Sequence, residues 1–162
     1  MKLRVIPCAL LAALLLSSCI SSRQRTSKKV NQEIEKMIEF AKKQINTPYV
    51  YGGSTPKGFD CSGYVQFVFS KFNYKLPRTA TDQSKIGLRI HRIEQIKPGD
   101  LVFFTGQNAK SRLPQHVGIV VKSNKQGQFS FIHASISKGV TISYSSEDYY
   151  KKRYLWAQKI IY

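Results

Sequence analysis

The feature that most constrains the fold is a change in hydrophobic periodicity partway along this 162-residue chain. Up to about residue 72, apolar side chains recur at helical spacing, and from residue 101 onward they fall in short β-rich runs separated by turn residues. Helices first and strands afterwards predict an α+β domain, with N-terminal helices packed on an antiparallel β-sheet. A chain of this length is expected to form one domain with a real core.

Two helices are expected before the strands. The first has its apolar residues at helical spacing from Asn31 and stops before Pro48, because proline disfavours helical geometry in the preceding residue. The second begins at Asp60, a favoured N-cap residue, and extends to about Phe72. A polar helix or turn is expected over residues 80–86. The strands are expected in five runs: 101–104, 116–121, 129–134, 140–143 and 155–161.

The N-terminus predicts an export signal. A short basic region, Met1 to Arg4, precedes a nearly continuous apolar stretch of about a dozen residues, which is too short to span a bilayer permanently. The sequence Leu16-Ser17-Ser18-Cys19 then resembles the lipobox of bacterial lipoproteins. We therefore expect a signal peptide at 1–18, a lipidated Cys19 with a flexible basic tether at 19–30, and a folded domain at 31–162. An ordinary cleaved signal with an incidental cysteine is the alternative.

The cysteines and the charge set the chemical context. In this interpretation Cys8 leaves with the signal and Cys19 carries lipid, so Cys61 is the one thiol of the folded domain and no intramolecular disulfide is available. Removing Lys2 and Arg4 with the signal takes the formal net charge from +17 to about +15, which attracts anionic partners. Peptidoglycan, with free carboxylates on its stem peptides, suits an exported basic protein better than nucleic acid does.

Three residues could form a reactive site. A cysteine in the first turn of a helix is expected to have a lowered thiol pKa, although a lone cysteine is more commonly a small buried apolar residue. His116 and His133 lie on successive expected strands and interrupt apolar positions, so one could act as a general base and the other could orient it. His91, in a basic polar stretch, is interpreted as structural. Zinc bound by Cys61, His116 and His133 is the rival interpretation of the site.

The chain resembles the NlpC/P60 family of papain-like cysteine peptidases, and most closely its lipid-anchored, single-domain murein endopeptidases. The resemblance covers about Ile34 to the C-terminus and is carried by a series of blocks in the family's order. These blocks are Pro48-Tyr49-Val50-Tyr51-Gly52-Gly53, Gly58-Phe59-Asp60-Cys61-Ser62-Gly63-Tyr64-Val65, Leu76-Pro77-Arg78-Thr79, Lys97-Pro98-Gly99-Asp100-Leu101-Val102-Phe103-Phe104, His116-Val117-Gly118-Ile119-Val120 and Phe131-Ile132-His133-Ala134-Ser135.

The resemblance implies a papain-like fold and a role for each matched residue. Cys61 would be the nucleophile, His116 the base that also protonates the leaving amine, and His133 the residue that orients His116. Tyr49 would lie beside the nucleophile and help to hold the oxyanion. Asp60 and Ser62 would border the pocket for the ammonium group of the stem peptide, with N-capping as the alternative role of Asp60; Arg78 is interpreted as structural.

The expected function is therefore that of a peptidoglycan endopeptidase that needs neither cofactor nor metal. The bond implied first joins γ-D-glutamate to diaminopimelate or lysine, and the alternative is the D-alanyl-diaminopimelate cross-link. A catalytically inactive wall-binding module and a nucleic-acid-binding protein are the rivals from other classes. We expect a monomer that is attached to the cell envelope by its lipid anchor; in a cell with two membranes it would sit in the outer membrane and face the periplasm.

Overall fold

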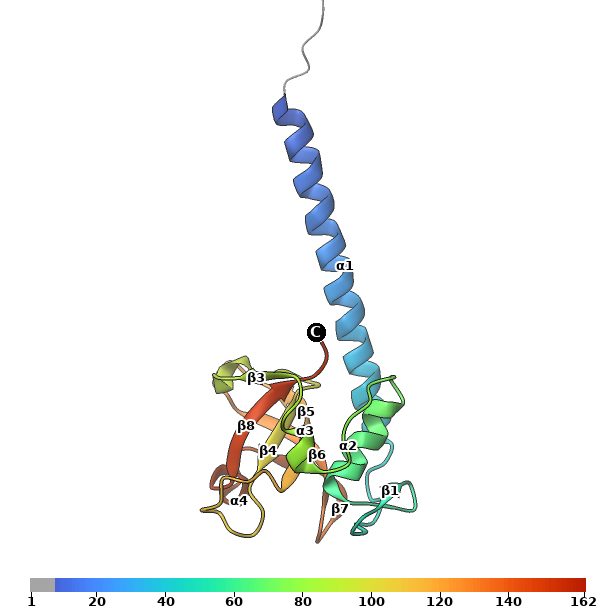
Figure 1. Ribbon diagram of the computed structural model, residues 1–162, viewed down its shortest axis with the longest axis vertical. Coiled ribbons are helices and arrows are strands. Elements are labelled where there is room, and N and C mark those ends of the chain that lie inside the picture. Colours follow the sequence, from blue (N-terminus) through green and yellow to red (C-terminus); the bar gives the residue numbers. More distant parts are fainter. Residues whose placement is uncertain (1–7) are drawn as a thin grey trace, which may run out of the picture. The chain divides into compact units, whose positions relative to one another are not determined.

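The computed structural model describes the backbone of residues 8–162 and the side chains from residue 25 onward. Helix α1 (Cys8–Lys42) contains neither glycine nor proline, so no residue in it favours an interruption (Figure 1). Segment 19–30, expected as an irregular tether, is therefore helical. Residues 1–7 of the expected signal, and the side chain of Cys19, lie outside the described residues. Within the described part, no helix combines the length and hydrophobicity needed to cross a membrane.

The chain divides into two compact units, and the boundary between them lies within α1. The first unit ends at Gln32, and the second, Glu33–Tyr162, contains the sheet. Short helices connect or flank the strands of the second unit: α2 (Cys61–Ser70), α3 (Ala80–Gln83), α4 (Asp148–Lys151) and the 3-10 helix η1 (Ile93–Gln95). The division into signal, tether and domain stays a prediction.

A six-stranded sheet with antiparallel neighbours forms the body of this unit, in the order β3-β8-β4-β5-β6-β7 (Figure 1). Its strands are β3 (Leu88–Ile90), β4 (Leu101–Phe104), β5 (His116–Ser123), β6 (Phe129–Ser135), β7 (Gly139–Tyr144) and β8 (Tyr154–Lys159). A separate pair joins β1 (Ser54–Thr55) to β2 (Gly58–Phe59). The predicted α+β class, with five strands where they were expected, is confirmed; β3 was not predicted.

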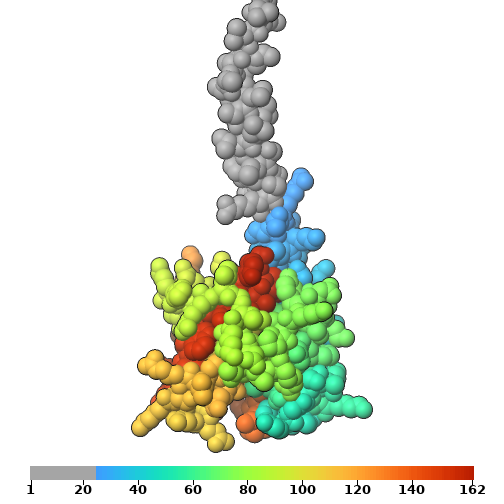
Figure 2. All heavy atoms as spheres, in the orientation of Figure 1, coloured from blue at the N-terminus to red at the C-terminus, as the bar shows by residue number. Residues whose placement is uncertain are grey.

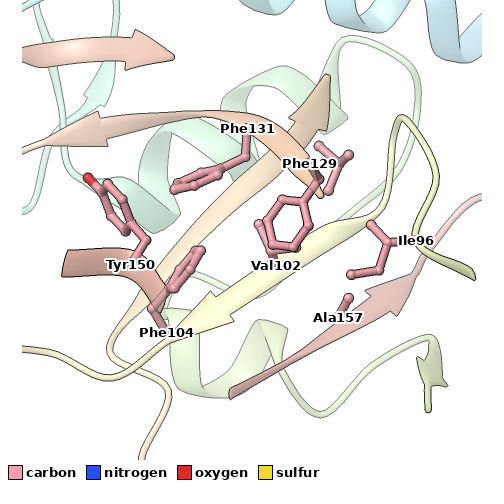
Figure 3. Packing of buried hydrophobic residues seen from close by; sticks show 8 residues of the cluster. Ile96, Val102, Phe104, Phe129, Phe131, Tyr150 and Ala157 are labelled. Carbon is pink, nitrogen blue, oxygen red and sulfur yellow. The ribbon is translucent and has the colours of Figure 1, made fainter. Parts of the chain in front are cut away.

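The core of the unit is an aromatic cluster on the sheet. Phe104 of β4 packs against Phe131 of β6, with 4.9 Å between ring centroids, and against Tyr150 of α4, at 5.4 Å. Figure 3 shows these three rings together, with the Tyr150 hydroxyl directed away from the two phenylalanines. The rest of the cluster is buried: Ile96, Val102, Val120, Phe129 and Ala157. Burying this much apolar surface makes the sheet a rigid support for side chains at its edge.

Helix α2 packs on β5 and β6 and is fixed to the end of α1. The fully buried Tyr64 donates its hydroxyl hydrogen to the Ala41 carbonyl oxygen at 2.9 Å. The rings of Phe40 and Phe67, 5.7 Å apart, add an aromatic contact between the same two helices. The last turns of α1, which correspond to the first helix expected from the sequence, therefore hold α2 in place.

Candidate active site

The first turn of α2 is built around Asp60, its N-cap. Asp60 Oδ1 accepts a hydrogen bond from the Gly63 amide at 2.7 Å, which satisfies one of the donors that a helix start leaves unpaired. A side chain at Gly63 would collide with the Gly53 carbonyl oxygen, so the glycine allows the preceding loop to lie directly against the helix. Cys61 is the first residue of α2, as predicted.

Arg78 completes this side of the site. Its guanidinium donates to Asp60 Oδ1 at 3.0 Å, to Asp60 Oδ2 at 2.6 Å and to Ser62 Oγ at 3.1 Å, while the Gly52 amide also donates to Oδ2 at 3.0 Å. Burial alone would raise the pKa of Asp60, but the hydrogen bonds from Arg78 and the amides of Gly63 and Gly52 hold it below its usual value. The Asp60 carboxylate is thus ionised, and both of its oxygens accept hydrogen bonds from groups of the protein.

The sulfur of Cys61 lies against the start of β5. Its Sγ is 3.8 Å from the Gln115 carbonyl oxygen, and the Val117 amide also acts on it, so the sulfur contacts the backbone on both sides of His116. The thiol is partly exposed. Burial and then the charge of Asp60 raise its pKa, against the smaller opposite effect of nearby backbone amides. The expected lowering by the helix start is therefore outweighed by desolvation.

His116 and His133 form the other half of the site. His116 Nε2 and His133 Nδ1 are 2.9 Å apart, and the two rings are perpendicular with centroids 4.9 Å apart. His116 begins β5, and His133 lies within β6, where its side chain is completely buried. Burial lowers the pKa of His116 to about 4 and that of His133 well below its usual value. Both rings are therefore neutral near pH 7.

Two hydroxyls hold the far side of His133. Ser143 Oγ and Tyr150 Oη each lie 3.2 Å from His133 Nε2. If His116 keeps a lone pair on Nδ1 to receive a proton, its hydrogen is on Nε2 and points at His133 Nδ1. His133 then carries its own hydrogen on Nε2 and donates it to the hydroxyls. The arrangement is compatible with the tautomer in which His116 can act as a base.

A cleft of about 490 Å³ opens over these groups, and Cys61, His116 and His133 all line it. Its walls come from the β4–β5 loop, the β6–β7 hairpin and α4, with Tyr49 on the α2 side. Figure 2 shows segments 105–113 and 50–58 at two sides of one face, with the chain near residue 140 between them. A peptide could therefore reach the sulfur and the imidazole together.

The structure brings some of the predicted residues together and not others. Cys61, His116, His133 and Tyr49 line the cleft, whereas Asp60 and Ser62 are buried beneath it and bonded to Arg78. Burial and the nearby Cys61 raise the pKa of Tyr49, which therefore stays protonated near neutral pH. The substrate contacts predicted for Tyr49, Asp60 and Ser62 stay predictions.

Gln115, Lys138, Ser143 and Tyr150 are among the residues that line the cleft and that sequence reasoning missed. For Ser143 the available signal was position: it lies on the strand that pairs with β6, two residues from Thr141, which is paired with His133. Strand residues two apart share a face, so Ser143 could be expected beside the buried histidine. Gln115 acts through its backbone carbonyl, which side-chain motifs do not reveal.

The rival zinc interpretation has little geometric support. The two histidine nitrogens that face each other at 2.9 Å are at hydrogen-bond distance and would have to separate for a metal ion to lie between them. Among the residues that the structure describes, no cluster of three or more histidine, cysteine or acidic side chains is arranged to hold a metal.

Comparisons with known proteins identify relatives of this chain. The model of the NlpC/P60 family matches residues 46–159. The chain is 44% identical over 119 residues to "Gamma-DL-glutamyl hydrolase" of Bacillus subtilis, covering 72% of this chain and 27% of that protein. It is 41% identical over 114 residues to "Murein DD-endopeptidase MepS/Murein LD-carboxypeptidase" of Escherichia coli, covering 70% of this chain and 55% of that one. The chain thus spans about half or less of these two relatives.

A solved structure shares the fold. A Staphylococcus aureus protein described as "similar to lipoprotein, NLP/P60 family" superposes with a TM-score of 0.70 at 32% identity, over 81% of this chain and 42% of that one. Domains of this kind have the papain-like fold, so the predicted fold is confirmed.

Proposed function

Because this chain belongs to the NlpC/P60 family, we propose that it is a cysteine peptidase that cleaves amide bonds in the stem peptides of peptidoglycan. One observation carries the proposal: the Cys61 sulfur contacts the backbone on both sides of His116, whose far ring nitrogen is hydrogen-bonded to His133. All three side chains line one cleft, which supports Cys61 as the nucleophile, His116 as the base and His133 as the residue that orients the base.

The resting site holds a neutral thiol and a neutral imidazole, so the reaction begins with proton transfer. His116 Nδ1 takes the thiol proton as the Cys61 sulfur attacks the carbonyl carbon of the amide. We propose that backbone amides at the start of α2 and the Tyr49 hydroxyl stabilise the oxyanion. His116 then gives its proton to the leaving amine, and a thioester joins Cys61 to the substrate. Water, deprotonated by His116, hydrolyses that thioester and restores the thiol.

The proposed bond is the one between γ-D-glutamate and diaminopimelate or lysine. The name of the Bacillus subtilis relative, a γ-DL-glutamyl hydrolase, supports this bond. The name of the Escherichia coli relative, a murein DD-endopeptidase, supports the second candidate, the D-alanyl-diaminopimelate cross-link. A catalytically inactive wall-binding module ranks lower, because the thiol and both imidazoles line one cleft and the two imidazoles are hydrogen-bonded to each other.

Digestion of purified peptidoglycan tests the proposal. The full-length protein and its Cys61→Ala variant are compared, with the products identified by mass spectrometry and folding checked by circular dichroism. New amino and carboxyl termini that only the wild type produces would establish the enzyme and name the bond. Equal products from both proteins would remove Cys61 from the mechanism. No product from either folded protein would favour a wall-binding module.

We also propose that Cys19 is lipidated after removal of residues 1–18 and anchors the protein at the cell envelope, as a monomer. In a cell with two membranes the anchor would lie in the outer membrane, facing the periplasm. The lipobox-like sequence supports this. Labelling cells with a radioactive fatty acid should mark the wild type and leave the Cys19→Ser variant unmarked; label on both would refute the assignment.

A further inference from the structure

The β6–β7 hairpin places a lysine at the cleft. Ser135 pairs with Gly139 across the hairpin, so the turn consists of Ile136, Ser137 and Lys138. All five residues except the buried Gly139 line the cleft that also holds Cys61 and His116. Lys138 is exposed, and its ammonium group is therefore available to a substrate in the cleft.

This turn is held firmly in position. Gly139 has a φ of 66°, and a side chain there would collide with the Thr47 carbonyl oxygen, so the hairpin base lies directly on the loop before Tyr49. The Val140 amide donates to the Thr47 carbonyl oxygen at 2.8 Å, and the Asn46 amide donates to the Val140 carbonyl oxygen at 2.9 Å. Lys138 is thus carried by a backbone that is anchored to the rest of the site, which lowers the ordering cost of a contact with substrate.

Lys138 lines the same cleft as His116 and His133. Among the described residues, no carboxylate forms an ion pair with it. The charge is close enough to His133 to contribute to the lowering of its pKa, after burial and His116. The acidic residue that lines the cleft, Glu147, acts on Tyr150 instead, and its Oε1 accepts a hydrogen bond from the Tyr144 amide at 2.6 Å.

Two hydroxyls complete the group. Ser135 Oγ and Ser137 Oγ are 3.3 Å apart, and either can donate a hydrogen to the other or to a ligand. A cation beside two hydroxyl donors, on a fixed turn, suits a carboxylate: the lysine supplies the point charge and the serines supply directed hydrogen bonds. Stem peptides carry carboxylates of this kind close to the bonds that the proposed reaction cleaves.

We propose that Lys138, Ser135 and Ser137 form a subsite that binds a free carboxylate of the stem peptide and thereby selects non-amidated substrates. The inference rests on the proposed function and adds its specificity. The carboxylate is either that of γ-linked D-glutamate or that of diaminopimelate, and both would satisfy the same three groups. We expect removal of the subsite to change mainly substrate binding, because the charge of Lys138 is the smallest of the three effects on the pKa of His133.

The test uses cross-linked stem-peptide dimers in three forms: all carboxylates free, the D-glutamate carboxylate amidated, and the diaminopimelate carboxylate amidated. For the full-length wild type, amidation of one of the two residues should raise KM about 5- to 20-fold, the loss expected for one charge-assisted contact in a partly exposed site. The Lys138→Met variant should bind the free form as weakly as that amidated form, with kcat nearly unchanged. If amidation of one residue raises KM for the wild type but not for Lys138→Met, the carboxylate of that residue is the one that the subsite binds.

Matched variants make the result specific. Lys125→Met removes an exposed lysine from the turn between β5 and β6, outside the cleft, and should change nothing. Lys138→Arg should restore most of the discrimination. Equal KM values for the three substrate forms with the wild type, or an equal rise for all three in Lys138→Met, would overturn the subsite.

A binding measurement separates this inference from the proposed function. Calorimetric titration of Cys61→Ala, and of Cys61→Ala combined with Lys138→Met, reports the same discrimination without turnover. If the wild type cleaves none of the dimers but Cys61→Ala still prefers the free carboxylate through Lys138, the proposed function fails and the subsite stands. If the wild type cleaves the dimers and Cys61→Ala shows no such preference, the proposed function stands and the subsite fails.

Discussion

On the α2 side of the cleft Cys61 is positioned by charged hydrogen bonds, whereas on the sheet side His116 is positioned by neutral ones. The Asp60 carboxylate and the Arg78 guanidinium, in a salt bridge of 2.6 Å, fix the first turn of α2. His116 instead contacts the buried ring of His133, which two hydroxyls hold among aromatic side chains. A charged support tolerates partial exposure to water, whereas the base needs a dry setting that keeps it uncharged.

The largest effect is expected from removing the base. His116→Ala should lower kcat/KM by at least about 1000-fold, because no other group on the sheet side can take the thiol proton. His133→Ala should be milder, about 10- to 100-fold, because orientation contributes less than proton transfer. His91→Ala, which changes an exposed histidine, is the control and should leave the rate unchanged. Steady-state kinetics would contradict the comparison if His133→Ala were the more damaging variant.

The neutral state of the base should appear in the pH dependence. Burial lowers the pKa of His116 to about 4, so at about pH 5 the ring remains mostly neutral and kcat/KM should exceed by about 30-fold the value expected for an ordinary histidine of pKa near 6.5. Because the folded pKa lies below the unfolded one, the stabilising contribution of the neutral ring is present above about pH 6.5 and is lost as the pH falls through about 4. An acid limb of kcat/KM near pH 6.5 would contradict this assignment.

The protonation state of the Cys61 thiol can be tested separately. If Cys61 is a neutral thiol at rest, the wild type should show no more ultraviolet thiolate absorbance at neutral pH than Cys61→Ala, and absorbance should appear only in alkali. A thiolate signal at neutral pH would mean that the helix start outweighs burial. The site would then resemble an ion pair, and the contrast between its two sides would disappear.

A moderate effect is expected from the charged support. Arg78→Ala should lower the free energy of unfolding by about 1–2 kcal/mol, a figure reduced for the 39% exposure of the arginine side chain, because Asp60 loses its cation. The carboxylate then binds protons more readily, so this loss should shrink as the pH falls below the usual range of aspartate. Chemical denaturation measures both, with Lys85→Ala, from an exposed ion pair, as the control that should shift nothing.

The smallest effect is expected from the hydroxyls behind His133. Tyr150→Phe should lower kcat only about 2- to 5-fold, since Ser143 remains to accept the same hydrogen from His133 Nε2. Combined with Ser143→Ala, the loss should exceed the product of the two single losses, because the imidazole then has no acceptor. Strictly multiplicative losses would show that the two hydroxyls act separately.

Much of this molecule could be predicted from sequence where the pattern is local. Strand β4 was expected at 101–104 and has those bounds, because four apolar residues follow the turn Lys97-Pro98-Gly99-Asp100. The N-cap role of Asp60 is also local, and its bond to the Gly63 amide spans three residues. The three side chains proposed to react could be singled out because each interrupts or begins a regular pattern.

What could not be predicted depends on contacts between distant segments. Strand β3 is short, and Leu88 and Arg89 are exposed; its pairing with β8, about 70 residues later, defines it as a strand. Arg78 donates hydrogen bonds to the carboxylate of Asp60, 18 residues earlier, and no local motif revealed this pairing. The raised thiol pKa was missed as well, because burial, which depends on the tertiary fold, outweighs the backbone amides that lower it.

The contact between Gly63 and Gly53 has a consequence for protein engineering. The position of Cys61 is set by a direct backbone contact between the start of α2 and the preceding loop, because neither Gly63 nor Gly53 has room for a side chain. Substitutions elsewhere along the cleft, such as at Ile136, Ser137 or Tyr149, can therefore change which peptides are accepted without moving the sulfur. The scaffold separates a fixed Cys61 from a rim that is free to vary, which makes it a suitable starting point for directed evolution of new peptide specificities.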